Sequence, residues 1–360
     1  MKKYLLLISC ILIVKPISPS ACTAFSLRDH GQILVAKNLD WPIGEGLIIL
    51  NKCGVEKSAF GNREKKFSWG SQYGSITFNQ FGKEFPLGGM NEAGLVIEEL
   101  NLFDKGPQHD SLFALNEFQW VQYHLDTYAS VAEIVGSLRF VIVTPLFVNL
   151  HYFVADRHGD VAIIEFYDGQ VHIYKDDAVR YPVLSNNTYA HSLNYLRNFR
   201  GFGGDLPVRR ESTSGERFVR TAAYLSDLAI AGKTSNVETA LALLDSVRQD
   251  DTQWSIVYDI RNKRIHFQTA DQSETRSVDI DAFDFTCGTP SRYYDMRSPD
   301  TGGITSLFRT LTPQRNTDLV MEVSRQYRTI DPDNAKREQF LGMAVYGNGI
   351  GCGPVRSHKK

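Results

Sequence analysis

The sequence contains few cysteines and has no basic stripe or repeat. Five cysteines in 360 residues are too few for a disulfide scaffold, and their spacing does not fit a zinc site. Without a polybasic cluster, neither a nucleic acid nor a membrane surface is indicated as a partner. No low-complexity tract or interdomain linker stands out, and 42% hydrophobic with 22% charged residues is typical of a folded globule.

The only long apolar run lies at the N-terminus. Lys2 and Lys3 precede apolar residues from Tyr4 to Val14, and small residues ending at Ala21 follow. This order is typical of a secretory signal peptide, and the run is shorter than the roughly 20 residues of a membrane-spanning helix. We therefore predict a signal peptide over 1–21, a mature chain of 22–360 and a periplasmic or secreted protein.

An alternative leader must be weighed, because the segment around Leu7 and Cys10 resembles the lipidation site of bacterial lipoproteins. A lipoprotein would be cleaved just before Cys10. Because the apolar run continues to Val14, that cleavage would fall in the middle of the run, so the signal peptide is the favoured interpretation. Its removal leaves 36 basic against 41 acidic residues.

Four cysteines remain in the predicted mature chain: Cys22, Cys53, Cys287 and Cys352. If Cys22 is kept for chemistry, at most one disulfide can form among the other three. The sequence leaves that pairing open.

Alternating apolar residues predict strands in the first hundred residues of the mature chain. Residues 22–41 read as a hairpin that turns at Gly31, 45–52 as a further strand, and 90–94 as a turn with Gly94 at positive φ. Three more strands are expected over 150–176, and others over 253–272 and 276–285.

Helical spacing of apolar residues appears over 115–138 and 317–330. Two further helices have capping-box starts, one at Thr213 with Glu216 and one at Ser235 with Glu238. The first places Arg217 in or beside an opening helical turn, and the chain is expected to end in a Gly-rich, basic tail. Grouped strands and helices predict a single domain of mixed α+β, two-sheet architecture.

Cys22 stands directly after the predicted cleavage site, which suggests how it could act as a nucleophile. A cysteine nucleophile needs a base, yet none of the nine histidines lies in a recognisable cysteine-protease context. Cleavage after Ala21 would give Cys22 a free α-amine, whose ordinary pKa of about 8 suits a base near neutral pH. One residue would then supply both nucleophile and base.

Four segments in order resemble the motifs of the choloylglycine hydrolase and penicillin V acylase family. They are CTAFSL with VAKNLDW, then GGMNEAGLVIEELN, YPVLSNN and ERFVR, and the resemblance runs from Cys22 to about Asp284. The resemblance implies an αββα sandwich of the N-terminal nucleophile hydrolase type, hydrolysis of linear non-peptide amides, and no metal or organic cofactor. It also implies an oligomer, often a tetramer in this family.

The resemblance implies a role for each of five residues. Cys22 matches the nucleophile, Asp40 the carboxylate that holds its amine and thiol, and Asn101 the amide donor to the oxyanion. Asn186 matches an amide near the nucleophile, and Arg217 the cation that lowers the thiol pKa. These types suit the chemistry, since an oxyanion needs fixed neutral donors and a thiolate needs a nearby cation.

One further candidate departs from the family pattern. Lys37 stands three residues before Asp40, where the family usually has arginine. Lysine keeps the charge but loses the planar fork of arginine, so Lys37 is either a site residue or a strand lysine with a solvated head group.

The substrate is not decided by the sequence. A conjugated bile salt, penicillin V and an N-acyl homoserine lactone each place an apolar acyl group on an amide. Loops over 51–67 and 107–114 are expected to select among them. A non-catalytic binding protein on the same fold, and an acyltransferase with an amine acceptor, remain as alternatives.

Overall fold

The computed structural model describes residues 22–61, 67–103, 113–231, 235–332 and 336–352. The predicted signal peptide over 1–21 and the alternative lipidation site at Cys10 lie outside these residues, as does part of each predicted specificity loop.

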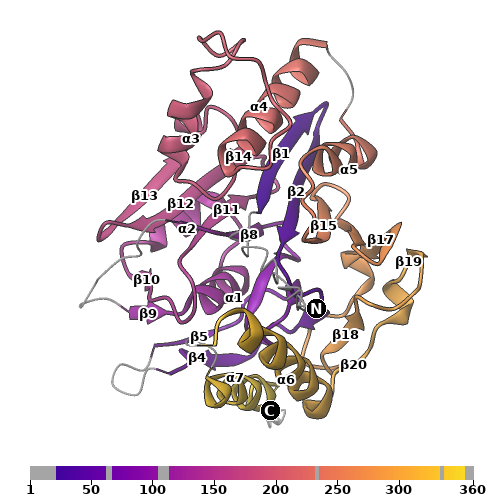
Figure 1. Cartoon of the computed structure of the whole chain (residues 1–360). Helices are drawn as coiled ribbons and strands as arrows, with labels where there is room; N and C mark the ends of the chain where they lie inside the picture. Colours follow the sequence, from indigo (N-terminus) through magenta and orange to yellow (C-terminus); the bar gives the residue numbers. More distant parts are fainter. Residues whose placement is uncertain (1–21, 62–66, 104–112, 232–234, 333–335, 353–360) are drawn as a thin grey trace, which may run out of the picture.

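Two large sheets dominate the fold (Figure 1). The first sheet has seven strands in the order β14, β1, β2, β15, β16, β17, β19: Val183–Leu184, Thr23–Asp29, Gln32–Asp40, Thr252–Asp259, Arg264–Thr269, Gln272–Asp279 and Gly302–Gly303. The second sheet has nine in the order β13, β12, β11, β8, β7, β6, β3, β18, β20: Gln170–Lys175, Val161–Tyr167, Leu150–Ala155, Val96–Asn101, Pro86–Asn91, Ser75–Asn79, Leu47–Asn51, Arg292–Asp295 and Arg309–Thr310. Two small ladders pair β4 (Glu56–Ser58) with β5 (Ser68–Gly70), and β9 (Phe113–Leu115) with β10 (Val141–Val143).

The predicted N-terminal hairpin is confirmed as β1 and β2. Their register runs from Thr23 opposite Asn38 to Asp29 opposite Gln32. The turn uses positive φ at His30 and at Gly31, as a tight turn between twisted strands requires. The residue before β1, Cys22, therefore lies beside the last residues of β2.

Helices cover the outer faces of both sheets. Helix α4 contacts β1 and β14, α5 contacts β2 and β15, and α1 contacts β7 and β8. Because β1 also contacts β8 and β11 across the centre, the order of layers is helix, sheet, sheet, helix, which confirms the αββα sandwich. The helices are α1 (Glu117–Thr127), α2 (Val131–Ser137), α3 (Tyr189–Leu196), α4 (Ser214–Ala231), α5 (Val237–Ser246), α6 (Pro313–Ile330) and α7 (Arg337–Gly349), with short 3₁₀ turns at Asp176–Ala178, Ile280–Ala282 and Thr305–Leu307.

Two local predictions are corrected by the structure. The helical pattern over 115–138 forms two helices, because the Ser130 side chain caps α2 and starts a new helix there. Helix α5 is capped by Asn236, not by Ser235. Helix α7 was not predicted, and its Phe340 and Met343 are buried in the core; most of the expected Gly-rich, basic tail follows it and lies outside the described residues.

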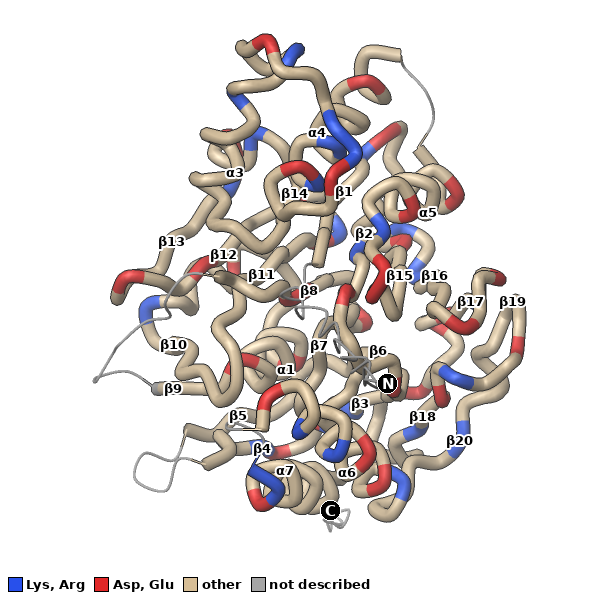
Figure 2. Tube along the Cα trace, viewed as in Figure 1, with Lys and Arg blue, Asp and Glu red and all other residues tan. Residues whose placement is uncertain are grey.

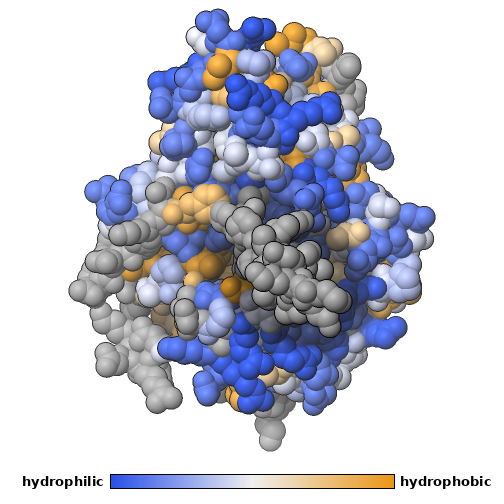
Figure 3. Space-filling view, viewed as in Figure 1, coloured by the Kyte–Doolittle hydropathy of each residue, from blue (hydrophilic) through white to orange (hydrophobic). Residues whose placement is uncertain are grey.

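Basic and acidic residues are interspersed along the described chain (Figure 2). The face in Figure 3 is mostly hydrophilic, with apolar side chains in small groups. None of the described helices is both long enough and apolar enough to span a bilayer.

Candidate active site

Cys22 lies at the N-terminal end of β1, at the junction of the two sheets, and only 4% of it is exposed. The guanidinium of Arg217 donates from Nη1 to the Cys22 carbonyl oxygen and to Thr23 Oγ1, each at 2.5 Å. Arg217 comes from the first turn of α4, as the capping pattern predicted, and Thr213 Oγ1 accepts from the Glu216 backbone N–H there. The backbone of Cys22 is thus fixed by a buried cation.

Asp40, the last residue of β2, is fully buried and presents two unequal carboxylate oxygens. Its Oδ1 accepts a 2.5 Å hydrogen bond from Thr252 Oγ1. Its Oδ2 lies 3.8 Å from Arg217 Nη1 and has no hydrogen-bond partner among the described residues. Burial raises the Asp40 pKa to about 7, although Arg217 and Thr252 oppose that rise. A buried carboxylate oxygen without a donor is costly, so this position calls for a donor.

A chain of hydrogen bonds joins Arg217 to the two predicted asparagines. Arg217 Nη2 donates to Asn186 Oδ1 at 2.9 Å, and Asn186 Nδ2 donates to the Asn101 carbonyl at 2.8 Å. Both polar atoms of the Asn186 amide are thereby occupied. Asn101 ends β8 and lines the same cavity as Cys22.

Lys37 is buried, which excludes the alternative of a strand lysine with a solvated head group and is consistent with the preferred interpretation of Lys37 as a site residue. Only 1% of Lys37 is exposed, and its Nζ extends from the first sheet to the second. There it lies 2.9 Å from Glu98 and 3.7 Å from Glu99. Glu98 also accepts a hydrogen bond from Tyr258. Burial alone would lower the Lys37 pKa, but the two glutamates raise it above its ordinary value. Lys37 is therefore a cation held between the sheets.

The surroundings of the Cys22 thiol favour its protonated form at neutral pH. Burial raises its pKa to about 12, and Lys37 is the strongest influence in the opposite direction. Asp40 and Glu99 add to the rise, since nearby negative charges disfavour a thiolate. Without a base or a further positive charge, this thiol is a poor nucleophile.

A narrow cavity of about 50 Å³ opens beside Cys22 and is mostly apolar. Its walls include Phe81, Phe118, Phe147, Trp41 and Tyr327. Phe81 stacks on Phe118 with ring centroids 4.5 Å apart, and Trp41 lies 5.9 Å from Tyr327. The cavity suits a compact or flat apolar group next to the thiol.

Sequence reasoning missed several of these residues. None of the described residues within the expected specificity segments 51–67 and 107–114 lines the cavity. The walls come instead from the turn after β6, from α1, from the segment around Phe147 and from α6. Glu99 was also missed, although the consecutive acids in VIEELN within an otherwise apolar strand were a signal for it.

The open question of disulfide pairing is resolved by the structure. Cys287 is joined to Cys352, and Cys53 is free. Among the residues that the structure describes, no group of three or more His, Cys, Asp or Glu could hold a metal ion.

Known proteins are similar to this chain in sequence. The family model of linear amide C–N hydrolases, choloylglycine hydrolase family, matches residues 22–293. A penicillin V acylase of Pectobacterium atrosepticum is 26% identical over 311 residues, covering 74% of this chain and 82% of that protein.

Two solved structures share the fold. A penicillin V acylase from Agrobacterium tumefaciens superposes with a TM-score of 0.71 at 24% identity, over 81% of this chain and 98% of that one. A conjugated bile acid hydrolase from Clostridium perfringens gives 0.64 at 15% identity, over 78% and 98%. With the family model covering most of the chain, this protein belongs to the choloylglycine hydrolase family of linear amide C–N hydrolases.

Proposed function

We propose that this chain is an exported amidase that hydrolyses an N-acyl amide. Cys22 would become the N-terminal residue when a leader is cut after Ala21. Its thiol is then the nucleophile, and its α-amine is the base. The order of residues around position 21 supports the cut.

The observation that carries this proposal is the unsatisfied oxygen of Asp40. Oδ2 is buried near Cys22 and lacks a hydrogen-bond donor among the described residues. The α-amine of Cys22 supplies such a donor through its N–H groups, and once it has taken the thiol proton it also supplies a matching positive charge. Thr252 and Arg217 keep the carboxylate in place on its other sides. The unsatisfied oxygen of Asp40 thus supports the proposal of a free N-terminus at Cys22.

In acylation, the α-amine takes the thiol proton and the sulfur attacks the amide carbonyl carbon. The tetrahedral intermediate collapses when the amine passes that proton to the leaving nitrogen, and the C–N bond breaks. A thioester to Cys22 remains. Water, deprotonated by the same amine, attacks the thioester, and the acid leaves as the thiol is restored.

The developing oxyanion needs donors that are fixed before the reaction begins. The side-chain amide of Asn101 is the candidate, since Asn101 lines the Cys22 cavity and its own carbonyl is held by Asn186. Arg217 donates hydrogen bonds to both Asn186 and the Cys22 carbonyl, and it thereby positions the oxyanion donor and the thiol relative to each other. Lys37 supplies the positive charge that most favours the thiolate.

The cavity favours one of the three substrate classes. Its aromatic walls and small volume suit a flat aromatic acyl group such as that of penicillin V. A rigid steroid would require several of these buried rings to move. The penicillin V acylases among the relatives agree with this choice.

The test uses protein that begins at Cys22, verified by intact mass, with penicillin V, a conjugated bile salt and an N-acyl homoserine lactone as substrates. We expect hydrolysis, fastest for penicillin V, and none from a folded Cys22→Ala variant. A matched control carries one extra alanine before Cys22, which keeps the thiol but blocks the amine, and it should also be inactive. An active Cys22→Ala variant would refute the mechanism.

The same assay separates the two alternatives. Addition of hydroxylamine or a primary amine diverts the thioester if acyl transfer competes with hydrolysis. A binding protein would leave Cys22 unacylated while the ligand still raises the melting temperature.

A further inference from the structure

Helices α6 and α7 lie beyond residue 293, where the match to the family model ends. They pack against each other at the same end of the molecule as β4 and β5 (Figure 1). We propose that this C-terminal hairpin forms a wall of the acyl cavity, and that Tyr327 limits the length of acyl group that the cavity accepts. The inference rests on the proposed function and specifies its substrate class.

Tyr327 of α6 reaches the cavity directly. It is 2% exposed and lines the same cavity as Cys22. Its ring centroid lies 5.6 Å from Phe147 and 5.9 Å from Trp41, both of which also line the cavity. Phe340 of α7, which is not part of the cavity lining, packs on Tyr327 and on Phe147, with ring centroids 5.7 Å and 5.1 Å away. The Tyr327 ring therefore covers part of the path from the cavity to Phe340.

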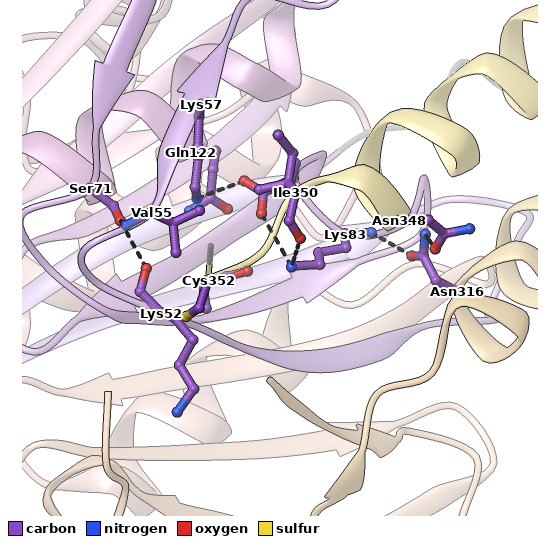
Figure 4. Close-up of polar contacts among 12 residues, drawn as sticks. Lys52, Val55, Lys57, Ser71, Lys83, Gln122, Asn316, Asn348, Ile350 and Cys352 are labelled. Carbon is purple, nitrogen blue, oxygen red and sulfur yellow. Dashed lines mark hydrogen bonds and ion pairs between the residues drawn. The ribbon is translucent and has the colours of Figure 1, made fainter. Parts of the chain in front are cut away.

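The hairpin also holds a second part of the wall. Gln80 and Phe81, which follow β6, line the cavity, and the chain then turns through Lys83 and Glu84, where Glu84 has a positive φ of 75°. The Lys83 backbone N–H donates to Asn316 Oδ1 of α6 at 2.7 Å. Lys83 Nζ donates to the Ile350 carbonyl at 2.6 Å, just after α7 (Figure 4).

Several contacts hold the two helices of the hairpin to each other and to the rest of the protein, so we expect the wall to be rigid. Asn316 Nδ2 donates to Asn348 Oδ1 at 2.9 Å, which ties α6 to α7 (Figure 4). Gly347 lies so close to the Lys83 carbonyl that an added Cβ would stand 2.6 Å from it. The Cys287–Cys352 disulfide then anchors the end of the hairpin to the loop after β17. These contacts fix the backbone of the two helices, and the Tyr327 ring is itself packed between Trp41, Phe147 and Phe340.

This arrangement predicts which acyl groups are accepted. Aromatic and short linear acyl groups would end before they reach the Tyr327 ring, whereas a long linear chain would collide with that ring. Replacement of Tyr327 by alanine would extend the cavity towards Phe340, which is apolar. Each additional methylene that enters such a space gains burial, so a long chain benefits most.

The experiment measures kcat/KM for amides of one amine with phenoxyacetyl, butanoyl, octanoyl and dodecanoyl groups. In Tyr327→Ala, we expect the ratio of dodecanoyl to phenoxyacetyl to rise about tenfold or more. Tyr327→Phe should leave the ratio unchanged, because the ring remains. The matched control is Tyr346→Ala in α7, where the hydroxyl donates to the Ser58 carbonyl and the ring packs on Phe60 and Phe85, away from the cavity.

An unchanged ratio in folded Tyr327→Ala, or an equal change in Tyr346→Ala, overturns the proposal. If Tyr327→Ala does not fold, Tyr327→Leu is measured in its place. If the wild-type protein hydrolyses none of the amides, the proposed function fails. The wall is then tested in the Cys22→Ala background, by measuring how much each amide raises the melting temperature. The rise caused by the dodecanoyl amide must increase relative to that caused by the phenoxyacetyl amide only when Tyr327 is also replaced by alanine.

Discussion

Replacing Lys37 with methionine tests the buried ion cluster between the sheets. Lys37 Nζ lies 2.9 Å from Glu98, where an attraction of about 6 kcal/mol at an effective dielectric constant of about 20 offsets the loss of hydration. Without the lysine, Glu98 is left buried and unpaired. Such a group takes up a proton instead of remaining charged.

The cost of that proton depends on pH. A glutamate in the unfolded chain has a pKa of about 4.3, so holding it protonated in the fold costs about 4 kcal/mol at pH 7 and about 1 kcal/mol at pH 5. We therefore expect Lys37→Met to lower the free energy of unfolding by up to these amounts, since burial already raises the Glu98 pKa in the wild-type protein. The double variant Lys37→Met/Glu98→Gln should recover most of the loss at pH 7, since no ionisable group remains at position 98.

The assay is urea unfolding of the mature protein at pH 5 and pH 7. Lys57→Met is the matched control, because Lys57 is an equally buried lysine, 2.6 Å from Glu84 and 2.9 Å from Asp126. Glu98→Gln should not rescue that variant. If Lys37→Met lowers the free energy of unfolding by less than about 1 kcal/mol at pH 7, or by the same amount at both pH values, the charge of Glu98 does not depend on Lys37.

Three further predictions concern other parts of the molecule. Asn101→Ala should lower kcat by about 10² to 10³ with little change in KM, and an unchanged kcat in steady-state kinetics would remove it as the oxyanion donor. Burial raises the Glu99 pKa to about 7, so its stabilising protonated form is lost as the pH rises from about 4 to 7. Glu99→Gln should therefore gain stability relative to wild type between pH 5 and pH 8 in urea titrations, and a relative loss would contradict the sign. Cys352→Ser should lower the melting temperature by several degrees, and it should raise KM more than it lowers kcat, whereas an unaltered KM would separate the disulfide from the cavity.

Local patterns in the sequence predicted where Cys22 and Arg217 lie in the fold, whereas the roles of Cys22, Asp40 and Arg217 rest on the family resemblance and stay predictions. The hairpin of β1 and β2 brings Cys22 to the end of β2, where Asp40 lies, and the capping pattern placed Arg217 in the first turn of α4. These positions depend on strand alternation and helix starts, which short segments encode. The asparagines were found through family motifs and not through any local pattern.

The aromatic cavity could not be predicted in the same way. Phe81, Phe147 and Tyr327 come from segments far apart in the chain, and only the packing of α6 against the turn after β6 brings them together. The burial of Lys37 was missed for a related reason. Its partners Glu98 and Glu99 lie on the opposite sheet. The alternation of apolar and polar residues within β2 carries no information about an ion pair with a residue of the other sheet.

The burial of Cys22 has a consequence for the order of events in the proposed export. In the folded chain the residue that would follow the cut is 4% exposed, and β1 is paired on both sides immediately after it. A peptidase must bind the chain in an extended form around the bond, so we expect it to act before the first sheet assembles. Purified, folded precursor should then resist signal peptidase, while the urea-unfolded precursor is cut on dilution. A chain that folds too early would be trapped as a stable but inert protein, so the timing of cleavage would set the yield of active enzyme.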